Sequence, residues 1–393
     1  MPALNIASQN IETRPILRTM PSRISRDVFK GKQRSKASDD THLWAAVNWI
    51  KRAHDASDDD GVSYGYYLRP IGKKLSTLGW RESYVETSGY IIETLYDIGR
   101  IFDDKDANIR AEKIGHWLVS VQNPDGSFAN DNYAKDEGIV FDTGQVLFGL
   151  ARCFKETKNP IFQKAGEKAA LWLAEIMDED GAWRRHTHKN SVNTYNSRVA
   201  WSMLEFDAVS PNKTVFDAAV KNLEWAASQQ RENGFFDNCA FGQADAPFTH
   251  TIAYAIRGLM EGGRLSGEQR FYDAAEKAAV AVMPYVKEDG FLAGRIGVGG
   301  EALEESSCLT GNCQMAIVWY HLAERLGRED MRDTANRTLD YVMSVQDIKT
   351  KDGNVNGAIK GSHPIWGKYT PLAYPNWATK FFIEALLYKE KRL

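Results

Sequence analysis

The sequence predicts an all-α fold, an (α/α)6 barrel in which six helical hairpins close into a ring. The first observation is a short acidic turn ending in glycine, which recurs along the chain. These turns end at Gly61, Gly126, Gly181, Gly234, Gly290 and Gly353. Their spacing of 53 to 65 residues suits two helices of about 15 residues each and two loops.

The second observation is that two kinds of helix alternate around these turns. The segment 109–121, before the second turn, has apolar residues three and four apart with charges between them, which indicates one wet face. The segments after the turns carry few charges, so they must be buried on most sides. They begin at Thr87, Asp142, Thr194, Thr249, Leu309 and Tyr374. We therefore expect six inner helices inside six outer ones.

The starts of these inner helices carry residues that favour helix N-termini. Thr194, Thr249 and Asp142 are candidate N-caps, because their side-chain oxygens can accept hydrogen bonds from the first free N–H groups. Pro375 lies near a first turn, where its missing N–H costs nothing. Each inner helix is thus expected to begin just after the loop that carries a glycine turn.

Composition describes a globular protein with ample material for a core. The chain has 393 residues, of which 43% are hydrophobic and 26% charged, with a net charge of -3. We expect one barrel domain at 41–393, preceded by a basic arm at 1–40 that sustains no apolar period. The main body shows no nucleic-acid footprint, no membrane span and no secretory signal, so a cytoplasmic location is expected.

No cofactor or metal is expected. The four cysteines, Cys153, Cys239, Cys308 and Cys313, form no C-x-x-C pair and are interpreted as reduced thiols. His186 and His188 lie in a loop without further nearby ligands, which favours a solvated basic loop. The glycine-rich loop 294–307 matches neither a P-loop nor a dinucleotide fingerprint.

Two known groups resemble this pattern. The turns SVQNPDGSF at 120–128, EIMDEDGAW at 175–183 and SQQRENGFF at 228–236 resemble the QW-type repeats of terpenoid cyclases and protein prenyltransferases. Architecture and length are similar to the six-hairpin glycosidases, particularly unsaturated glucuronyl hydrolases and N-acylglucosamine 2-epimerases. The resemblance covers about residues 42 to 390 and is one of repeat pattern. The D-x-D-D acid of class II cyclases and the D-x-C of prenyltransferases are absent, which weakens a terpenoid function.

The leading hypothesis concerns two carboxylates at the starts of consecutive inner helices. If the inner helices are parallel, their first turns meet at one mouth, where free N–H groups favour an anionic ligand. Glu86 and Asp142 are expected to act there as the acid and base of glycoside hydrolysis. In the glucuronyl hydrolases two acidic residues of inner helices play such roles, and these positions match by repeat register. The alternative is that each carboxylate only caps its helix.

The substrate is expected to be an anionic glycan, an oligo- or polysaccharide that contains uronic acid. Tyr195 and His250 form an alternative catalytic set, in which proton abstraction beside a carboxylate gives a lyase or an epimerase. The expected substrate-binding residues are Asn196, Arg198, Arg295, Asn312, Gln314, Trp366, Tyr374, Asn376 and Lys380. Two other classes stay open, a terpenoid-cyclase-like toroid and a non-catalytic glycan-binding component of polysaccharide biosynthesis.

Overall fold

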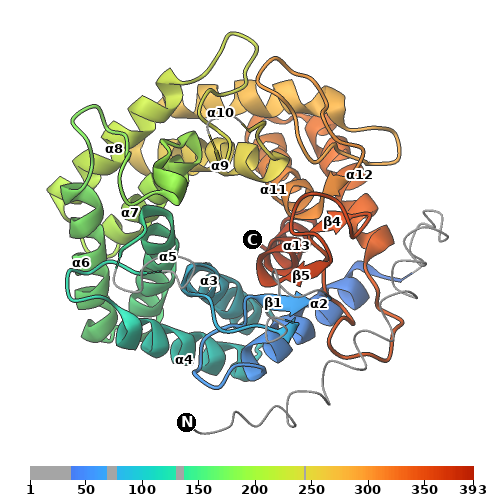
Figure 1. The fold of residues 1–393 in the computed structure, drawn as a ribbon, viewed down its shortest axis with the longest axis horizontal. Helices are drawn as coiled ribbons and strands as arrows, with labels where there is room; N and C mark the ends of the chain where they lie inside the picture. The colour runs from blue at the N-terminus through green and yellow to red at the C-terminus, as the bar shows by residue number, and fades with distance from the viewer. Residues whose placement is uncertain (1–36, 69–77, 130–136, 243–244) are drawn as a thin grey trace, which may run out of the picture.

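The computed structural model describes residues 37–68, 78–129, 137–242 and 245–393. Within them, six helices form an inner ring and six an outer ring (Figure 1). The inner helices are α3 (Val85–Phe102), α5 (Val140–Thr157), α7 (Ser197–Asp207), α9 (Thr249–Ser266), α11 (Leu309–Leu326) and α13 (Asn376–Lys389). The outer helices are α2 (Asp39–Asp55), α4 (Lys105–Val121), α6 (Pro160–Glu175), α8 (Lys213–Ser228), α10 (Gln269–Val282) and α12 (Glu329–Val345). The predicted (α/α)6 barrel is confirmed.

The expected basic arm falls mostly outside the described residues. Helix α2 begins at Asp39, after the N-cap Ser38, so the last two residues assigned to the arm belong to the first outer helix. No helix in the described part of the chain is long and apolar enough to span a membrane.

Short connections join five of the inner helices to the outer helix that follows each of them. Four of these connections turn through a left-handed residue, namely Asp103, Lys158, Gly267 and Gly327, with φ between 54° and 75°. A left-handed residue at this position ends a helix and reverses the chain. The sixth hairpin joins the two ends of the barrel, because α13 packs against α2.

The glycine turns lie at the opposite end, where they separate neighbouring outer helices. Gly126, Gly181, Gly234 and Gly290 have φ between 82° and 97°. A Cβ on Gly126 would lie 2.6 Å from the carbonyl oxygen of Lys168 in α6. The same atom on Gly290 would lie 1.9 Å from the carbonyl oxygen of Arg337 in α12. Only glycine combines this conformation with such a close backbone approach.

Glutamine side chains tie these turns to the next outer helix. The Nε2 of Gln122 donates to the carbonyl oxygens of Gly126 and Ala165, both at 2.9 Å. Gln230 makes the same pair of bonds in the turn that ends at Gly234. These bonds give the QW-like turns a structural role.

The sixth turn differs from its prediction. Gly357, with φ 84°, is the residue that approaches the next helix, because its Cβ would lie 2.0 Å from the carbonyl oxygen of Ala45. Gly353, which was expected in this role, has no such contact.

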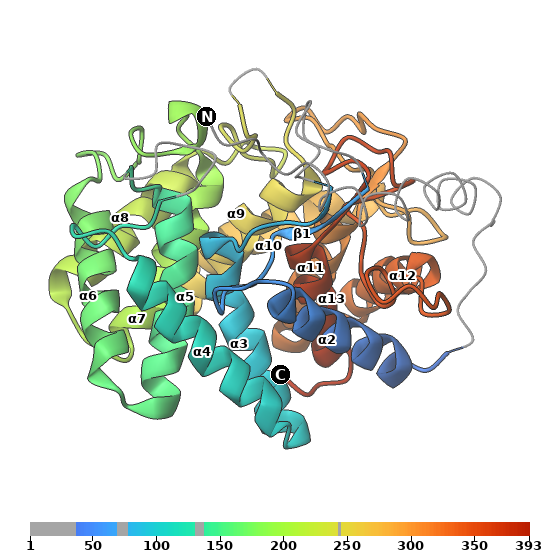
Figure 2. The same ribbon diagram turned by 60° about the horizontal axis from the view of Figure 1, so that its bottom comes forward.

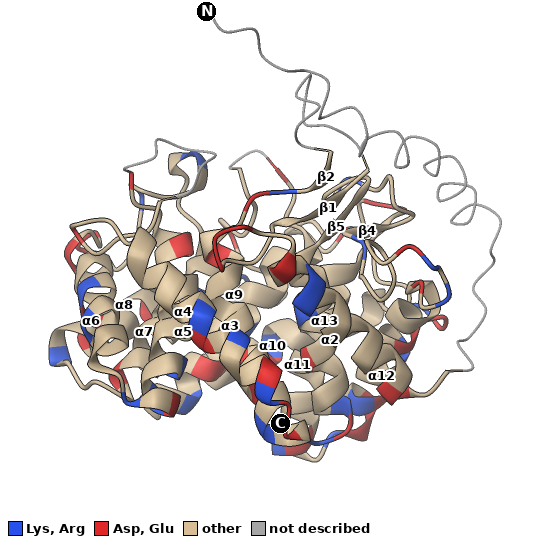
Figure 3. Cartoon of the chain, turned by 90° about the horizontal axis from the view of Figure 1, so that it is seen from below, with Lys and Arg blue, Asp and Glu red and all other residues tan. Residues whose placement is uncertain are grey.

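The mouth of the barrel is built from long loops and short strands. Strands β2 (Gly79–Trp80), β1 (Gly65–Tyr67) and β5 (Ala373–Pro375) form one antiparallel sheet, in which Tyr66 faces Tyr374. Strands β3 (Ser307–Cys308) and β4 (Ser362–His363) form another. Both sheets lie at the end where the inner helices begin, and the C-terminus lies at the other end (Figure 2, Figure 3).

The inner helices start without side-chain caps, so the three predicted N-caps are wrong. The N-caps of α5 and α9 are Ile139 and Phe248, and Thr194 begins a 3-10 turn before α7. Four outer helices are capped instead, by Ser38, Asp104, Asn159 and Asn212. Loop carbonyl groups cap several inner helices instead: the N–H of Thr249 donates to the carbonyl oxygen of Gly294 at 3.0 Å, and the N–H of Leu309 to that of Gly361 at 3.1 Å.

We expect Gly290→Ala to lower the free energy of unfolding by about 3 kcal/mol or more, because left-handed strain adds to an overlap with the Arg337 carbonyl. Gly327→Ala is the matched control. Gly327 also has a positive φ, but nothing lies within 4 Å of its Cβ position, so about 1 kcal/mol is expected. Urea unfolding of both variants measures the difference, and equal losses would show that the turn is not a tight spacer.

Candidate active site

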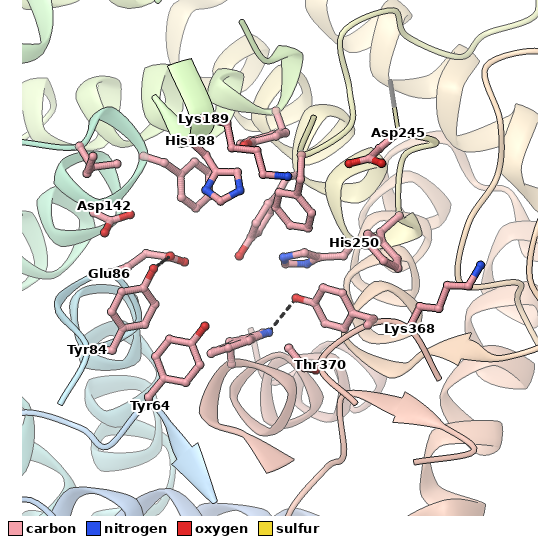
Figure 4. Close-up of a pocket in the computed structure, with 18 of the residues that line it drawn as sticks. Tyr64, Tyr84, Glu86, Asp142, His188, Lys189, Asp245, His250, Lys368 and Thr370 are labelled. Carbon is pink, nitrogen blue, oxygen red and sulfur yellow. Dashed lines mark hydrogen bonds between the residues drawn. The ribbon is translucent and has the colours of Figure 1, made fainter. Parts of the chain in front are cut away.

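A cavity of about 430 Å³ opens at the mouth, among the first turns of the inner helices. This volume lies in the range of small-molecule sites. Glu86, Asp142, Tyr195, His250 and Arg295, which the sequence places in the site, all line it. Figure 4 shows Glu86, Asp142 and His250 pointing into this cavity from different helices. Side chains that are far apart in the sequence thus share one pocket.

Glu86 lies in the first turn of α3, in a setting that favours its neutral form. Burial raises the pKa of this carboxyl from 4.5 to about 7, although Tyr84 and the cation of Arg198 act to lower it. The hydroxyl of Tyr84 donates a hydrogen bond to Glu86 Oε2 at 2.5 Å. A carboxyl group with such a pKa can hold a proton near neutral pH and release it to a substrate.

Asp142 lies in the first turn of the next inner helix, α5, and its side chain is buried at the cavity wall. Burial raises the pKa of Tyr84, and the charges of Asp142 and Glu86 raise it further. One tyrosine hydroxyl therefore experiences the field of both carboxyl groups. This arrangement brings together the two acidic residues that the sequence analysis paired.

His250 faces this pair from α9. Its Nδ1 lies 3.1 Å from Nε2 of Gln314 on α11. The ring packs against Tyr254 and Tyr369, with centroids 4.3 and 5.1 Å away. Burial and the nearby cation of Arg198 lower the pKa of His250 from 6.5 to about 3. The imidazole is therefore neutral at neutral pH.

Aromatic rings make up much of the cavity wall. Tyr195 is buried, and the centroid of its ring lies 5.4 Å from that of Phe141 and 5.9 Å from that of Phe241. Trp377, in the first turn of α13, donates from Nε1 to the hydroxyl of Tyr369 at 2.8 Å. Such faces suit the apolar sides of sugar rings.

Arg198 lies beneath the cavity and does not line it. Its side chain is fully buried among the rings of Tyr90, Phe148, Trp201, Tyr254 and Phe381, whose centroids lie 4.8 to 5.6 Å from its guanidinium carbon. Its Nε donates to Oε1 of Gln145 at 2.7 Å. Expected as a substrate-binding residue, Arg198 instead places a positive charge under the floor of the pocket.

Lys380 lies deeper still, in a buried network of charges on the barrel axis. Its Nζ bonds to the carboxylate of Glu384, which also pairs with Arg257 at 3.1 Å. Burial lowers the pKa of Lys380 to about 8, and the charge of Glu384 opposes this shift. Lys380 therefore helps to close the lumen below the cavity.

Several other expected binding residues hold the mouth together. Nδ2 of Asn376 donates to the carbonyl oxygen of Ser63 and to Oγ1 of Thr87, both at 2.8 Å, which ties α13 to the start of α3. Asn312 accepts a bond from the hydroxyl of Ser307 at 3.0 Å.

The remaining expected binding residues have different positions. Asn196 is buried at the start of α7, and Tyr374 lies in strand β5. Gln314 orients His250. Trp366 is 46% exposed and lies outside the cavity lining, between β4 and β5.

The rim carries three cations from different loops: Lys189, Arg295 and Lys368. Glu304 holds two of them, with its Oε1 at 3.3 Å from Arg295 Nε and 3.6 Å from Lys368 Nζ. The guanidinium of Arg295 also lies over the ring of Phe248, 4.1 Å from its centroid. Asp245 also lines the cavity, so the rim has charges of both signs, and its three cations can bind an anionic group of a substrate.

Sequence reasoning missed His188 and Lys189, which it placed in a solvated loop. The structure turns both side chains into the cavity (Figure 4). Lys189 and Asn190 adopt left-handed backbone conformations, with φ 57° and 49°. Strained residues of this kind cluster at functional sites, but no sequence pattern announced the strain. The part of the chain that the structure describes holds no group of three metal-ligating side chains.

Comparisons with known proteins agree with this architecture. The family model of the squalene-hopene cyclase C-terminal domain matches residues 85–259. A heparin-specific unsaturated glucuronyl hydrolase is 14% identical, over 90% of this chain and 98% of its own, with a TM-score of 0.69. The chain shares the (α/α)6 toroid fold of this hydrolase.

Two further solved structures show the range of this fold. The unsaturated glucuronyl hydrolase of Bacillus sp. GL1 is 16% identical, over 89% of this chain and 96% of its own, with a TM-score of 0.68. Cellobiose 2-epimerase from Bacillus thermoamylovorans is 12% identical, over 94% of this chain and 99% of its own, with a TM-score of 0.68. At these identities the likeness establishes the fold and not the reaction. No curated protein matches the sequence.

Glu86→Gln should stabilise this toroid more at high pH than at low pH. Between the unfolded pKa of 4.5 and the folded value of about 7, the folded protein holds a proton that the unfolded chain has lost. The free energy of unfolding of the wild type therefore falls as the pH rises through this window. Glutamine cannot ionise, so the Glu86→Gln variant does not show this fall. We expect the variant to gain on the order of 2 kcal/mol relative to the wild type between about pH 5 and about pH 8.

Denaturant unfolding at both pH values measures this gain. The exposed Glu179→Gln on the outer surface is the matched control. If the Glu86→Gln difference is the same at both pH values, Glu86 does not hold its proton in the folded state.

Proposed function

We propose that this toroid is a carbohydrate-active enzyme that hydrolyses the terminal glycosidic bond of a uronic-acid-containing oligosaccharide. The observation that carries the proposal is one aromatic pocket lined by two carboxyl groups from consecutive inner helices, Asp142 and Glu86, of which burial raises the pKa of Glu86 to about 7. Glycoside hydrolysis requires such a division between an acid and a base. No cofactor takes part.

Each carboxyl group has one task. Glu86 donates its proton to the oxygen of the departing sugar as the glycosidic bond breaks. Asp142 accepts a proton from the water molecule that forms the new bond to the sugar. The hydrogen bond from Tyr84 to Glu86 stabilises the carboxylate that remains after the transfer.

The shape of the pocket favours attack on the end of a glycan chain. Arg198, Tyr254 and the ion pairs below them fill the lumen, so a sugar can enter from the mouth alone. Tyr64, Phe241 and Trp377 offer ring faces in the wall. A chain end fits this closed pocket, whereas the middle of a polymer needs an open groove.

The rim cations Lys189, Arg295 and Lys368 favour an acidic sugar. This preference agrees with the names of the similar solved structures, which include unsaturated glucuronyl hydrolases. Epimerisation needs a base that removes a proton from carbon. A histidine with a pKa of about 3 suits this task poorly, so the geometry supports hydrolysis over the epimerase chemistry named for other similar structures.

We expect Asp142→Asn and Glu86→Gln each to lower kcat by about 10³-fold, because each removes one proton-transfer group. The assay follows reducing sugar released from a panel of uronate-ended oligosaccharides. Wild-type kcat/KM should decline above about pH 7, where Glu86 loses its proton. If both variants keep their activity and Tyr195→Phe loses it, the alternative catalytic set of Tyr195 and His250 carries out the reaction.

Lys189→Met should raise KM for a uronate-ended substrate about tenfold and leave kcat unchanged, because the lysine contacts the substrate without taking part in the reaction. A neutral oligosaccharide of the same length should show no such change. Lys213→Met, at an exposed position on α8, is the control for the loss of a positive charge. An equal rise in KM for the neutral sugar would argue against an anion contact.

A further inference from the structure

The hydrogen bond between Gln314 and His250 determines which ring nitrogen carries the proton. The atom of Gln314 that lies 3.1 Å from His250 Nδ1 is the amide nitrogen Nε2, which can only donate. With the amide in this orientation, Nδ1 accepts. A neutral imidazole that accepts at Nδ1 carries its proton on Nε2.

The other ring nitrogen faces the cavity. His250 lines the pocket, and Figure 4 shows its ring reaching toward the centre from α9. The hydrogen bond to Gln314 is made by Nδ1, which leaves Nε2 as the ring nitrogen on the side of the cavity. The Nε2–H group is therefore directed at whatever occupies the pocket.

The orientation of the ring is held from several sides. Tyr254 and Tyr369 pack against it, and Phe241 lies 6.2 Å away by ring centroids. The hydroxyl of Tyr369 is itself held by Trp377. Gln314 is buried on the second turn of α11, so its amide cannot exchange its partner for water.

We propose that Gln314 is a positioning residue that locks His250 as a neutral Nε2–H hydrogen-bond donor to the substrate. The histidine then binds an oxygen of the sugar and does not abstract a proton. Burial and the positive charge of Arg198 keep the pKa of His250 low, which opposes a second proton. The assignment of the His250 tautomer depends on geometry alone, whereas the hydrogen bond from His250 to a sugar rests on the proposed function.

The lock can be tested without substrate, by nitrogen NMR of the full chain labelled at histidine. The chain has eight histidines, and His250→Asn identifies the His250 signals by their loss. We expect a pyridine-like Nδ1 and a pyrrole-like Nε2 that do not titrate between about pH 5 and about pH 8. A pyrrole-like Nδ1, or a titration midpoint in this range, would overturn the lock.

A second variant tests whether Gln314 is the cause. Gln314→Glu replaces the amide donor with a carboxylate that accepts, so Nδ1 should become protonated and its signal pyrrole-like. Gln346→Glu, at another buried glutamine whose histidine partner is His42, is the matched control and should leave the His250 signals unchanged. If Gln314→Glu leaves the His250 signals unchanged, Gln314 does not set the tautomer.

Activity then separates a donor from a base. Asparagine retains an N–H donor but has no basic nitrogen, so His250→Asn should lower kcat/KM about tenfold and His250→Leu about a hundredfold. Equal losses of about 10³-fold or more in both variants would identify His250 as a base and overturn the proposal. A failure of the proposed hydrolytic mechanism would be seen separately. In that case Asp142→Asn and Glu86→Gln would keep full activity, while the NMR spectra would still show the expected tautomer of His250.

Discussion

The close approach of four glycine turns, at Gly126, Gly181, Gly234 and Gly290, to the backbone of the next outer helix is the constraint on which the rest of this structure depends. Gly126 and Gly290 contact carbonyl groups at distances that exclude a side chain, and their backbone conformations also favour glycine. Repeating this contact sets the outer helices at a regular spacing. The inner helices are thereby held parallel, with their N-termini at one mouth. A site shared by α3, α5 and α9 exists because the ring closes in this way.

Desolvation at this mouth then sets the protonation of the catalytic groups. Burial raises the pKa of Glu86 to about 7 and lowers that of His250 to about 3, so both shifts favour the neutral form of the side chain. The cation of Arg198 beneath the floor acts on both groups in one direction, since it disfavours protons on each. A pocket that holds two carboxyl groups and a neutral imidazole suits the proposed hydrolysis and lacks a strong histidine base. Polar layers below the pocket close the lumen, which makes the site blind.

Much of the site was predictable because repeat register is a local property. Glu86, Asp142, Tyr195 and His250 lie at or just before the first turns of inner helices, and the ring brings these positions together. The same argument overreached for Asn312 and Asn376, which begin inner helices but bond to neighbouring backbone and hydroxyl groups. The repeat register specifies which helical turn a residue occupies, but it does not specify the direction in which its side chain points. Lys189 was missed for a related reason, since a left-handed loop residue turned it inward.

The sequence by itself determined the alternation of wet and buried helices and the glycine turns between them, because hydrophobic periodicity and backbone freedom are encoded in neighbouring residues. It also placed two carboxyl groups at equivalent points of consecutive repeats. Only the tertiary structure decided which polar residues face the cavity, which lie beneath it and which carry protons. Those properties depend on burial and on the charges of residues such as Arg198, which reach Glu86 and His250 through space. Interactions of that kind leave no periodic trace in the chain.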